Sequence, residues 1–207
     1  MPRPAFRFRS RASDDLQITG DRIFLRLPRL ADFGEWSTLR TRSRAFLEPW
    51  EPRWPDDDLT RSAFQYRIRR YEADHGSGLA TPLFIFLKGS NQLVGGLTIG
   101  NIRRGAAETC TLGYWMGEAH AGRGLMHDAL RSIIPHVFER MRLHRIEAAC
   151  IPDNERSMHL LEKVGFRREG YLNGYLKING AWRDHLLYAL IAEDWRDRHA
   201  KPTKATG

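Results

Sequence analysis

The stretch from Tyr114 to Leu130, YWMGEAHAGRGLMHDAL, passes from one kind of structure to another within a few residues. Tyr-Trp-Met is typical of the end of a buried strand, and the residues from Leu125 to Met141 repeat apolar side chains at helical spacing. A glycine-rich loop lies between them. Glycine adopts a positive φ and lets the backbone approach a ligand, while a helix start offers unpaired N–H groups at the positive end of its dipole. The stretch therefore predicts a strand, an anion-binding loop and a helix.

The loop is suited to a pyrophosphate, which five backbone amides can cradle: those of Gly122, Arg123, Gly124, Leu125 and Met126. The Arg123 side chain adds positive charge. A Walker loop is excluded because Gly-Lys-Ser/Thr is absent, and a dinucleotide fingerprint is excluded because His127 stands where a third Gly or Ala is needed. A turn that only connects a strand to a helix is the alternative.

Composition indicates a folded protein of one domain. The chain has 207 residues, of which 42% are hydrophobic and 11% aromatic, enough for a sizeable core. Its net charge of +8 permits an anionic partner such as nucleic acid, a phosphate-rich cofactor or the ribosome, and equally a solvated basic face. Without an apolar run of 18 residues or a secretory h-region, the sequence predicts no membrane span and a cytoplasmic protein.

The cysteines and histidines predict neither a disulfide framework nor a metal site. Cys110 and Cys150 both lie in apolar stretches and are interpreted as buried thiols. No CxxC or HExxH pattern accompanies the histidines.

Periodicity and turn residues predict a mixed α/β sheet of about seven strands. The expected strands cover residues 16–27, 82–88, 93–102, 108–116, 144–151, 168–180 and 181–191, and the expected helices cover 29–47, 61–76, 125–141 and 155–166. The strands on either side of the 125–141 helix form a right-handed βαβ unit, so they should be parallel. We expect a basic arm at 1–15, one domain at 16–195 and a tail at 196–207.

Three further stretches carry a family resemblance: HRIEAACIPDNERSMHLLEKVGF at 144–166, REGYLNGYL at 168–176 and INGAWRDHLLYAL at 178–190. Together with the 112–130 region, in this order and spacing, they resemble the GNAT acetyltransferases. The resemblance covers residues 16–195. It is strongest to the RimJ/RimL branch, the ribosomal-protein N-terminal acetyltransferases.

The resemblance implies a GNAT fold with helices on both faces of the sheet and a V-shaped splay between two central parallel strands, ending near Met116 and Ile151. It implies acetyl-CoA as the acyl donor and no metal. The pantetheine would pair with the backbone of Trp115, Met116 and Gly117, and the pyrophosphate would lie on the amides of residues 122–126.

The resemblance also suggests residues for the chemistry. A backbone N–H near Met116 could stabilise the oxyanion. Asn154 would bind the cofactor or, alternatively, cap a helix, and Ser157 would donate to the CoA sulfur or serve as a plain first-turn serine.

No standard general base can be transferred from the family. Relatives carry a glutamate where this chain has Thr111 or Ala149, and a tyrosine where it has Leu161. Glu108 is the nominal base, with a solvated strand-end carboxylate as the alternative.

Three residues of the last hairpin are the predicted substrate-binding group. Tyr175 and Trp182 would line the acceptor site or belong to the core or its rim, and Asp184 could hold the substrate ammonium.

An enzyme without a strong general base is better suited to an acceptor amine that loses its proton easily. An α-amine of pKa about 7.8 costs ~1 kcal/mol to deprotonate at pH 7, whereas a lysine of pKa about 10.4 costs ~4.6 kcal/mol. The predicted activity is therefore acetylation of a protein N-terminus, as the resemblance implies of a small-subunit ribosomal protein. The alternatives are a small-amine acetyltransferase, acting on a polyamine or an antibiotic, and a ribosome- or RNA-associated factor that retains CoA binding. We expect a monomer or homodimer.

Overall fold

In the computed structural model, which describes residues 16–199, the strand β3 (Thr81–Leu87) is buried on both faces. Successive side chains of a strand point to opposite faces of the sheet. Leu83 and Ile85 therefore join one hydrophobic core, and Phe84 and Phe86 join another. A sheet with two apolar faces requires a helical layer on each.

The sheet has eight strands in the order β1-β2-β3-β4-β5-β6-β8-β7, and β5 and β6 are parallel, which confirms the predicted mixed α/β fold. Besides β3 it contains β1 (Gln17–Thr19), β2 (Ile23–Arg26), β4 (Leu93–Arg103), β5 (Thr109–Met116), β6 (Arg145–Cys150), β7 (Arg167–Ile178) and β8 (Ala181–Ile191). The strand beyond the expected seven arises because residues 16–27 fold into β1 and β2 around a tight turn.

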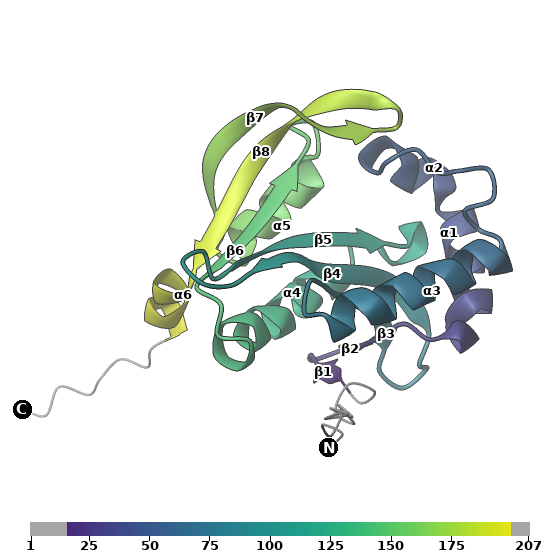
Figure 1. The fold of residues 1–207 in the computed structure, drawn as a ribbon, viewed down its shortest axis with the longest axis horizontal. Coiled ribbons are helices and arrows are strands. Elements are labelled where there is room, and N and C mark those ends of the chain that lie inside the picture. The colour runs from purple at the N-terminus through teal and green to yellow at the C-terminus, as the bar shows by residue number, and fades with distance from the viewer. Residues whose placement is uncertain (1–15, 200–207) are drawn as a thin grey trace, which may run out of the picture.

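Helices cover both faces of this sheet, as predicted (Figure 1). The helices α1 (Phe33–Arg42) and α3 (Arg61–Gly76) pack on one face, and α4 (Leu125–Pro135) and α5 (Glu155–Lys163) on the other. Two shorter helices are α2 (Arg44–Leu47) and α6 (Ala192–His199). The larger core lies under α4 and α5.

Local signals place several boundaries where the sequence predicted them. The Thr60 hydroxyl accepts a hydrogen bond from Ala63 N at 3.3 Å and starts α3. Asn179 and Gly180 both have positive φ, 44° and 86°, as a tight hairpin turn requires. The helix expected to reach Met141 is regular only to Pro135, after which His136–Arg140 form a π-helical turn. Proline has no N–H with which to continue the α-helical ladder.

The predicted domain limits fall partly outside the described residues. Helix α6 carries the chain to His199, so residues 196–199 of the expected tail are helical. The expected arm at 1–15 and residues 200–207 are not among the described residues. Within residues 16–199, no helix has the length and apolarity needed to cross a membrane.

Candidate active site

Strands β5 and β6 pair over only the first part of their length. The parallel ladder joins Thr109 to Arg145 and ends at Thr111 and Glu147. Beyond that point each strand stays paired with its outer neighbour, β5 with β4 as far as Met116, and β6 with β8. The two strands therefore diverge, which confirms the predicted V-shaped splay.

The backbone of β5 directs alternate amides toward the splay. Gly117 N donates to Val94 O at 2.9 Å on the β4 side. Since alternate residues of a strand bond to the same side, Trp115 also faces β4, while Met116 and Tyr114 face the splay. Of the three residues predicted to pair with pantetheine, Met116 thus has its amide on the open side. The amide of Gly117 is already occupied.

The glycine loop has the conformation that an anion-binding turn requires. Gly122 and Gly124 have φ of 72° and 73°, and Gly124 is the N-cap of α4. Asp128 N, bonded to Gly124 O at 3.1 Å, forms the first helical hydrogen bond. The amides of Leu125 and Met126 therefore belong to the unpaired helix end. A Cβ on Gly122 would meet nothing within 4 Å, so the loop is open around it.

A second arginine lies at this loop, and sequence reasoning missed it. The buried Asp128 carboxylate accepts hydrogen bonds from Asp21 N at 2.9 Å and from Arg22 N at 2.7 Å. These bonds hold the β1–β2 turn against the start of α4. The Arg22 guanidinium comes within 3.0 Å of where a Cβ of Gly124 would be. The contact joins residues more than 100 positions apart, which no local pattern reveals.

Asn154 and Ser157 meet at the start of α5, the helix that follows β6. Asn154 Oδ1 accepts a hydrogen bond from Ser157 N at 3.1 Å, so Asn154 caps the helix, as its alternative interpretation held. The Ser157 hydroxyl lies 2.8 Å from the Tyr114 hydroxyl of β5. Burial raises the pKa of Tyr114, although the hydrogen bond to Ser157 opposes the shift.

A cavity of about 250 Å³ opens on the α1–α3 face of the sheet, next to the same part of β5. Its lining consists of Trp36, Arg40, Glu51, Arg67, Tyr71, Phe84, Thr98, Gly113, Tyr114 and Trp115. Gly96 makes room for one wall, because a Cβ there would lie 2.5 Å from the Trp115 indole nitrogen. Tyr114 thus borders the cavity and bonds to Ser157.

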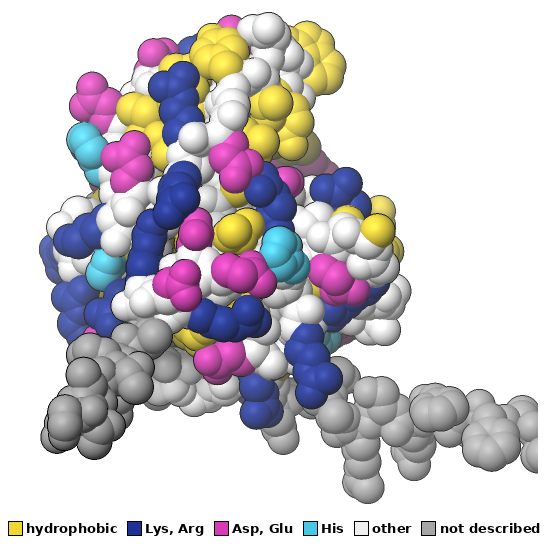
Figure 2. Space-filling view, turned by 90° about the vertical axis from the view of Figure 1, so that its left-hand side faces the viewer, with side chains coloured by type: hydrophobic (Ala, Val, Ile, Leu, Met, Phe, Trp, Pro, Cys, Tyr) yellow, Lys and Arg dark blue, Asp and Glu magenta, His cyan; other side chains and the backbone are white. Residues whose placement is uncertain are grey.

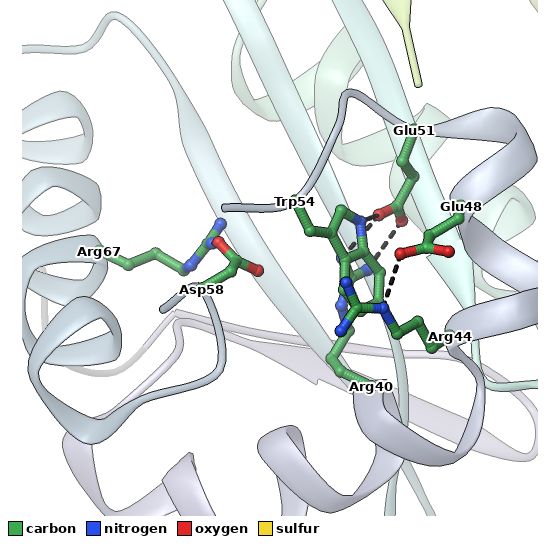
Figure 3. Close-up of polar contacts among 7 residues, drawn as sticks. All are labelled: Arg40, Arg44, Glu48, Glu51, Trp54, Asp58 and Arg67. Carbon is green, nitrogen blue, oxygen red and sulfur yellow. Dashed lines mark hydrogen bonds and ion pairs between the residues drawn. The ribbon is translucent and has the colours of Figure 1, made fainter. Parts of the chain in front are cut away.

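An arginine–carboxylate cluster forms the rim of this cavity (Figure 3). Arg40 binds Glu51 through both terminal nitrogens, at 2.7 and 2.6 Å, and Trp54 Nε1 donates to the same carboxylate at 2.8 Å. The guanidinium carbon lies 4.0 Å from the centre of the Trp54 ring and 4.9 Å from that of Trp115. Glu51 is the carboxylate among the lining residues, and these three hydrogen bonds fix its position.

Glu108 does not join this site. It precedes β5 at the end opposite Met116, about 25 Å away along an extended strand. Its carboxylate accepts hydrogen bonds from Gly105 N at 3.0 Å and Arg104 Nη1 at 3.1 Å, and its φ is 38°. Glu108 is thus a partly exposed strand-end carboxylate, as its alternative interpretation held, and it also closes the β4–β5 turn.

The β7–β8 hairpin reaches over the loop that carries Glu51. Asn179 N in the hairpin turn donates to Glu51 O at 2.9 Å. Trp182 is 67% exposed and Tyr175 is 42% exposed. Figure 2 shows hydrophobic side chains at the top of the molecule, over this hairpin, and interspersed basic and acidic side chains below.

Asp184 is engaged within the hairpin. Its carboxylate accepts hydrogen bonds from Gly174 N and from the Tyr171 hydroxyl, both at 2.7 Å. Both hydrogen bonds lower the pKa of Asp184, and the bond from Gly174 has the larger effect. Both oxygens hold a bulge in β7, so a substrate ammonium would have to share the carboxylate with Gly174 and Tyr171.

A second cavity and the two cysteines complete the description of this region. A larger cavity, of about 960 Å³, lies between α1, the β3–β4 turn and residues 118–120, and shares no residue with the predicted cofactor set. Cys110 and Cys150 are buried free thiols, as predicted, and burial raises the pKa of Cys110 to about 12. No group of three potential metal ligands occurs among residues 16–199.

Comparisons with known proteins agree with this geometry. A family profile described as "Acetyltransferase (GNAT) domain" matches residues 22–167. The chain is 36% identical over 180 residues to the ribosomal protein uS5-alanine N-acetyltransferase of Escherichia coli K12, covering 87% of this chain and 93% of that protein. It therefore belongs to the GNAT acetyltransferase family.

Two solved structures show how far the similarity extends. RimJ of Mycobacterium smegmatis, in complex with CoA-disulfide, has a TM-score of 0.83 and 36% identity, covering 87% of this chain and 89% of that one. The ribosomal-protein-S5-alanine acetyltransferase of Vibrio fischeri has a TM-score of 0.80 and 32% identity, covering 87% and 99%. The resemblance to the RimJ/RimL branch is confirmed.

Proposed function

We propose that this enzyme transfers the acetyl group of acetyl-CoA to the N-terminal α-amine of a ribosomal protein. The observation that carries the proposal is the splay between β5 and β6, with the Gly122–Gly124 loop at its mouth. An extended pantetheine arm can add to a free strand edge by main-chain hydrogen bonds, as a peptide does. The free helix-start amides, with Arg123 and Arg22 nearby, suit a pyrophosphate.

Each residue at the splay has a proposed task. Acetyl-CoA supplies the activated acetyl thioester. The amide of Met116 donates to the thioester carbonyl oxygen and stabilises the charge that develops there. Ser157 donates its hydroxyl hydrogen bond to the sulfur, whose bond to the acetyl carbon breaks as the bond to the amine forms. Asn154 fixes Ser157 by capping the helix.

The cavity on the other side of β5 is the proposed acceptor site. It reaches Gly113, Tyr114 and Trp115, so an amine held there is close to the splay. Both oxygens of Glu51 are already engaged by Arg40 and Trp54, so this carboxylate is not assigned the role of base. Water then removes the amine proton, which favours an α-amine over a lysine by roughly 3.5 kcal/mol at pH 7.

The names of the relatives suggest the acceptor. The Escherichia coli and Vibrio fischeri proteins are named as acetyltransferases of an alanine of ribosomal protein uS5 or S5. We infer a small-subunit ribosomal protein with a small first residue, modified in the cytoplasm. Tyr175 and Trp182, exposed on the hairpin above the cavity rim, would contact the following residues of that protein. RNA contact through the basic surface, and a monomeric or dimeric state, remain predictions.

The test is thiol release from acetyl-CoA with a panel of acceptors. The panel contains peptides that begin with Ala, Ser or Met, spermine, and a lysine peptide blocked at its N-terminus. We expect turnover with a free α-amine, fastest with Ala, and mass spectrometry to place the acetyl group on that nitrogen.

Other outcomes would contradict the proposal. Turnover with spermine alone would make the protein a small-amine acetyltransferase. Acetyl-CoA binding without turnover on any peptide or on purified small-subunit ribosomal proteins would favour a factor that only binds CoA.

A further inference from the structure

One hydrogen bond crosses the splay where the strand ladder has ended. Tyr114 belongs to β5, and Ser157 belongs to α5, the helix reached from β6, yet their hydroxyl oxygens are 2.8 Å apart. The last backbone pair between β5 and β6 is Thr111 with Glu147, before Tyr114 along the strand. The two walls of the splay are therefore joined at this depth by side chains.

Both partners are held in place. Ser157 N bonds to Asn154 Oδ1, which fixes the first turn of α5. Tyr114 packs against the larger core, and its backbone is paired with Leu97 of β4. Burial raises the pKa of Tyr114, so the phenol keeps its proton at neutral pH and has a hydrogen to donate.

The direction of the bond follows from the acidity of the two hydroxyls. A phenol is a stronger acid than an alkyl alcohol and is therefore the better hydrogen-bond donor. When Tyr114 donates to Ser157 Oγ, the one hydroxyl hydrogen of Ser157 goes to a second acceptor, either the Cys150 sulfur, with which Ser157 also interacts, or the leaving sulfur. Chains of such bonds strengthen one another, because each donation polarises the next hydroxyl.

We propose that Tyr114 is a positioning residue that donates to Ser157 Oγ and thereby directs the Ser157 hydroxyl toward the leaving sulfur. The inference rests on the proposed function. No proton passes from Tyr114: the acetyl carbon–sulfur bond breaks, the sulfur leaves as a thiolate that accepts the Ser157 hydrogen bond, and the new ammonium loses its proton to water. A thiol is more acidic than either hydroxyl, so neither hydroxyl transfers its proton to the leaving thiolate. The Ser157 hydroxyl therefore stabilises the thiolate by donating a hydrogen bond.

The same contact could merely tie α5 to the sheet, and Tyr188 provides the control. The Tyr188 hydroxyl of β8 donates to Glu162 Oε1 of α5 at 3.1 Å, and Tyr188 is 1% exposed. Both tyrosines thus anchor α5 to the sheet, but of the two only Tyr114 bonds to Ser157. Replacing either by Phe removes one oxygen and keeps the ring.

The experiment compares Tyr114→Phe, Ser157→Ala, the double variant and Tyr188→Phe with the wild type. The readouts are kcat and KM on the preferred peptide, the Kd of acetyl-CoA and the melting temperature. We expect Ser157→Ala to lower kcat roughly 30-fold and Tyr114→Phe about tenfold, as loss of one hydrogen bond to charge predicts. The Kd should stay within about twofold, and the double variant should match Ser157→Ala because the two residues act as one unit.

Several outcomes would overturn the inference. A kcat for Tyr114→Phe equal to wild type, an equal loss in Tyr188→Phe, or a double variant whose losses multiply would each show that Tyr114 does not act through Ser157. If Tyr114→Phe unfolds, 3-fluorotyrosine at position 114 keeps a hydroxyl, and loss of kcat in that folded protein would contradict the inference. Failure of the wild type with every amine would instead refute the proposed function.

Discussion

Asp128, in the first turn of α4, accepts a hydrogen bond from the backbone amide of Arg22 at 2.7 Å and places that arginine beside the Gly122–Gly124 loop. The packing is close, because a Cβ on Gly20 would lie 2.6 Å from the Asp128 carboxylate. The β1–β2 turn and the start of α4 therefore form one unit. Through this contact the edge of the sheet would contribute to the proposed cofactor site.

Replacing Asp128 with Ala should weaken both stability and cofactor binding. Two backbone amides lose their partner, which costs about 1–3 kcal/mol in unfolding free energy. Arg22 is also released, so the Kd of acetyl-CoA should rise severalfold. Glu35→Ala is the control, since Glu35 accepts a backbone bond from Leu93 at 2.9 Å away from the loop. Equal changes in Kd for both variants, measured by calorimetry, would contradict the role of Asp128.

The loop itself is tested by two glycines with the same backbone conformation. Gly124 has φ of 73° and its Cβ would approach Arg22, whereas Gly89 has φ of 85° and open space around it. Alanine at either position costs about 1–2 kcal/mol because a left-handed conformation is unfavourable for it. Only Gly124→Ala should also raise the Kd of acetyl-CoA, by about tenfold or more. An unchanged Kd in Gly124→Ala would remove this loop from the cofactor site.

The sequence predicted this loop and the splay because both follow from order along the chain. A strand, two glycines and a helix are local signals, and the parallel pair follows from the helix between β5 and β6. Which of the predicted amides face the splay depends on the register in which β5 pairs with β4. The sequence alone does not reveal that register. The prediction for Glu108 was wrong for a related reason. Glu108 and Met116 are eight residues apart, and because the residues between them form an extended strand, they lie at opposite ends of β5.

The acceptor side could not be predicted in the same way. Arg40 and Glu51 come from a helix and a proline-rich loop without periodicity, and their pairing depends on how that loop folds back. The sequence correctly placed the charged residue Asp184 on the hairpin that β7 and β8 form. It could not show that a bulge in β7 already occupies both of its oxygens.

Glu51→Gln should destabilise the rim of the acceptor cavity. Arg40 is 7% exposed and would keep a charge without its partner, at a cost of about 3–5 kcal/mol. Glu48→Gln is the control, because Glu48 pairs with the half-exposed Arg44 and should change stability by less than about 1 kcal/mol. We expect Glu51→Gln also to raise the KM for the peptide, with the Kd of acetyl-CoA unchanged. Chemical denaturation that ranks the two variants equally would contradict the role of the cluster.

Acid should loosen the β7–β8 hairpin through Asp184. The pKa of this carboxyl is lowered in the folded protein by the bonds from Gly174 and Tyr171. Its stabilisation is therefore fully present above the unfolded value of about 3.9 and is lost as the pH falls through the lower, folded value. The protection factor of the Gly174 amide, which is its intrinsic exchange rate divided by the observed rate, should fall over that range, before global unfolding. Asp184→Asn should show fast exchange at neutral pH and lose the transition, whereas a transition retained in Asp184→Asn would assign it to another carboxyl.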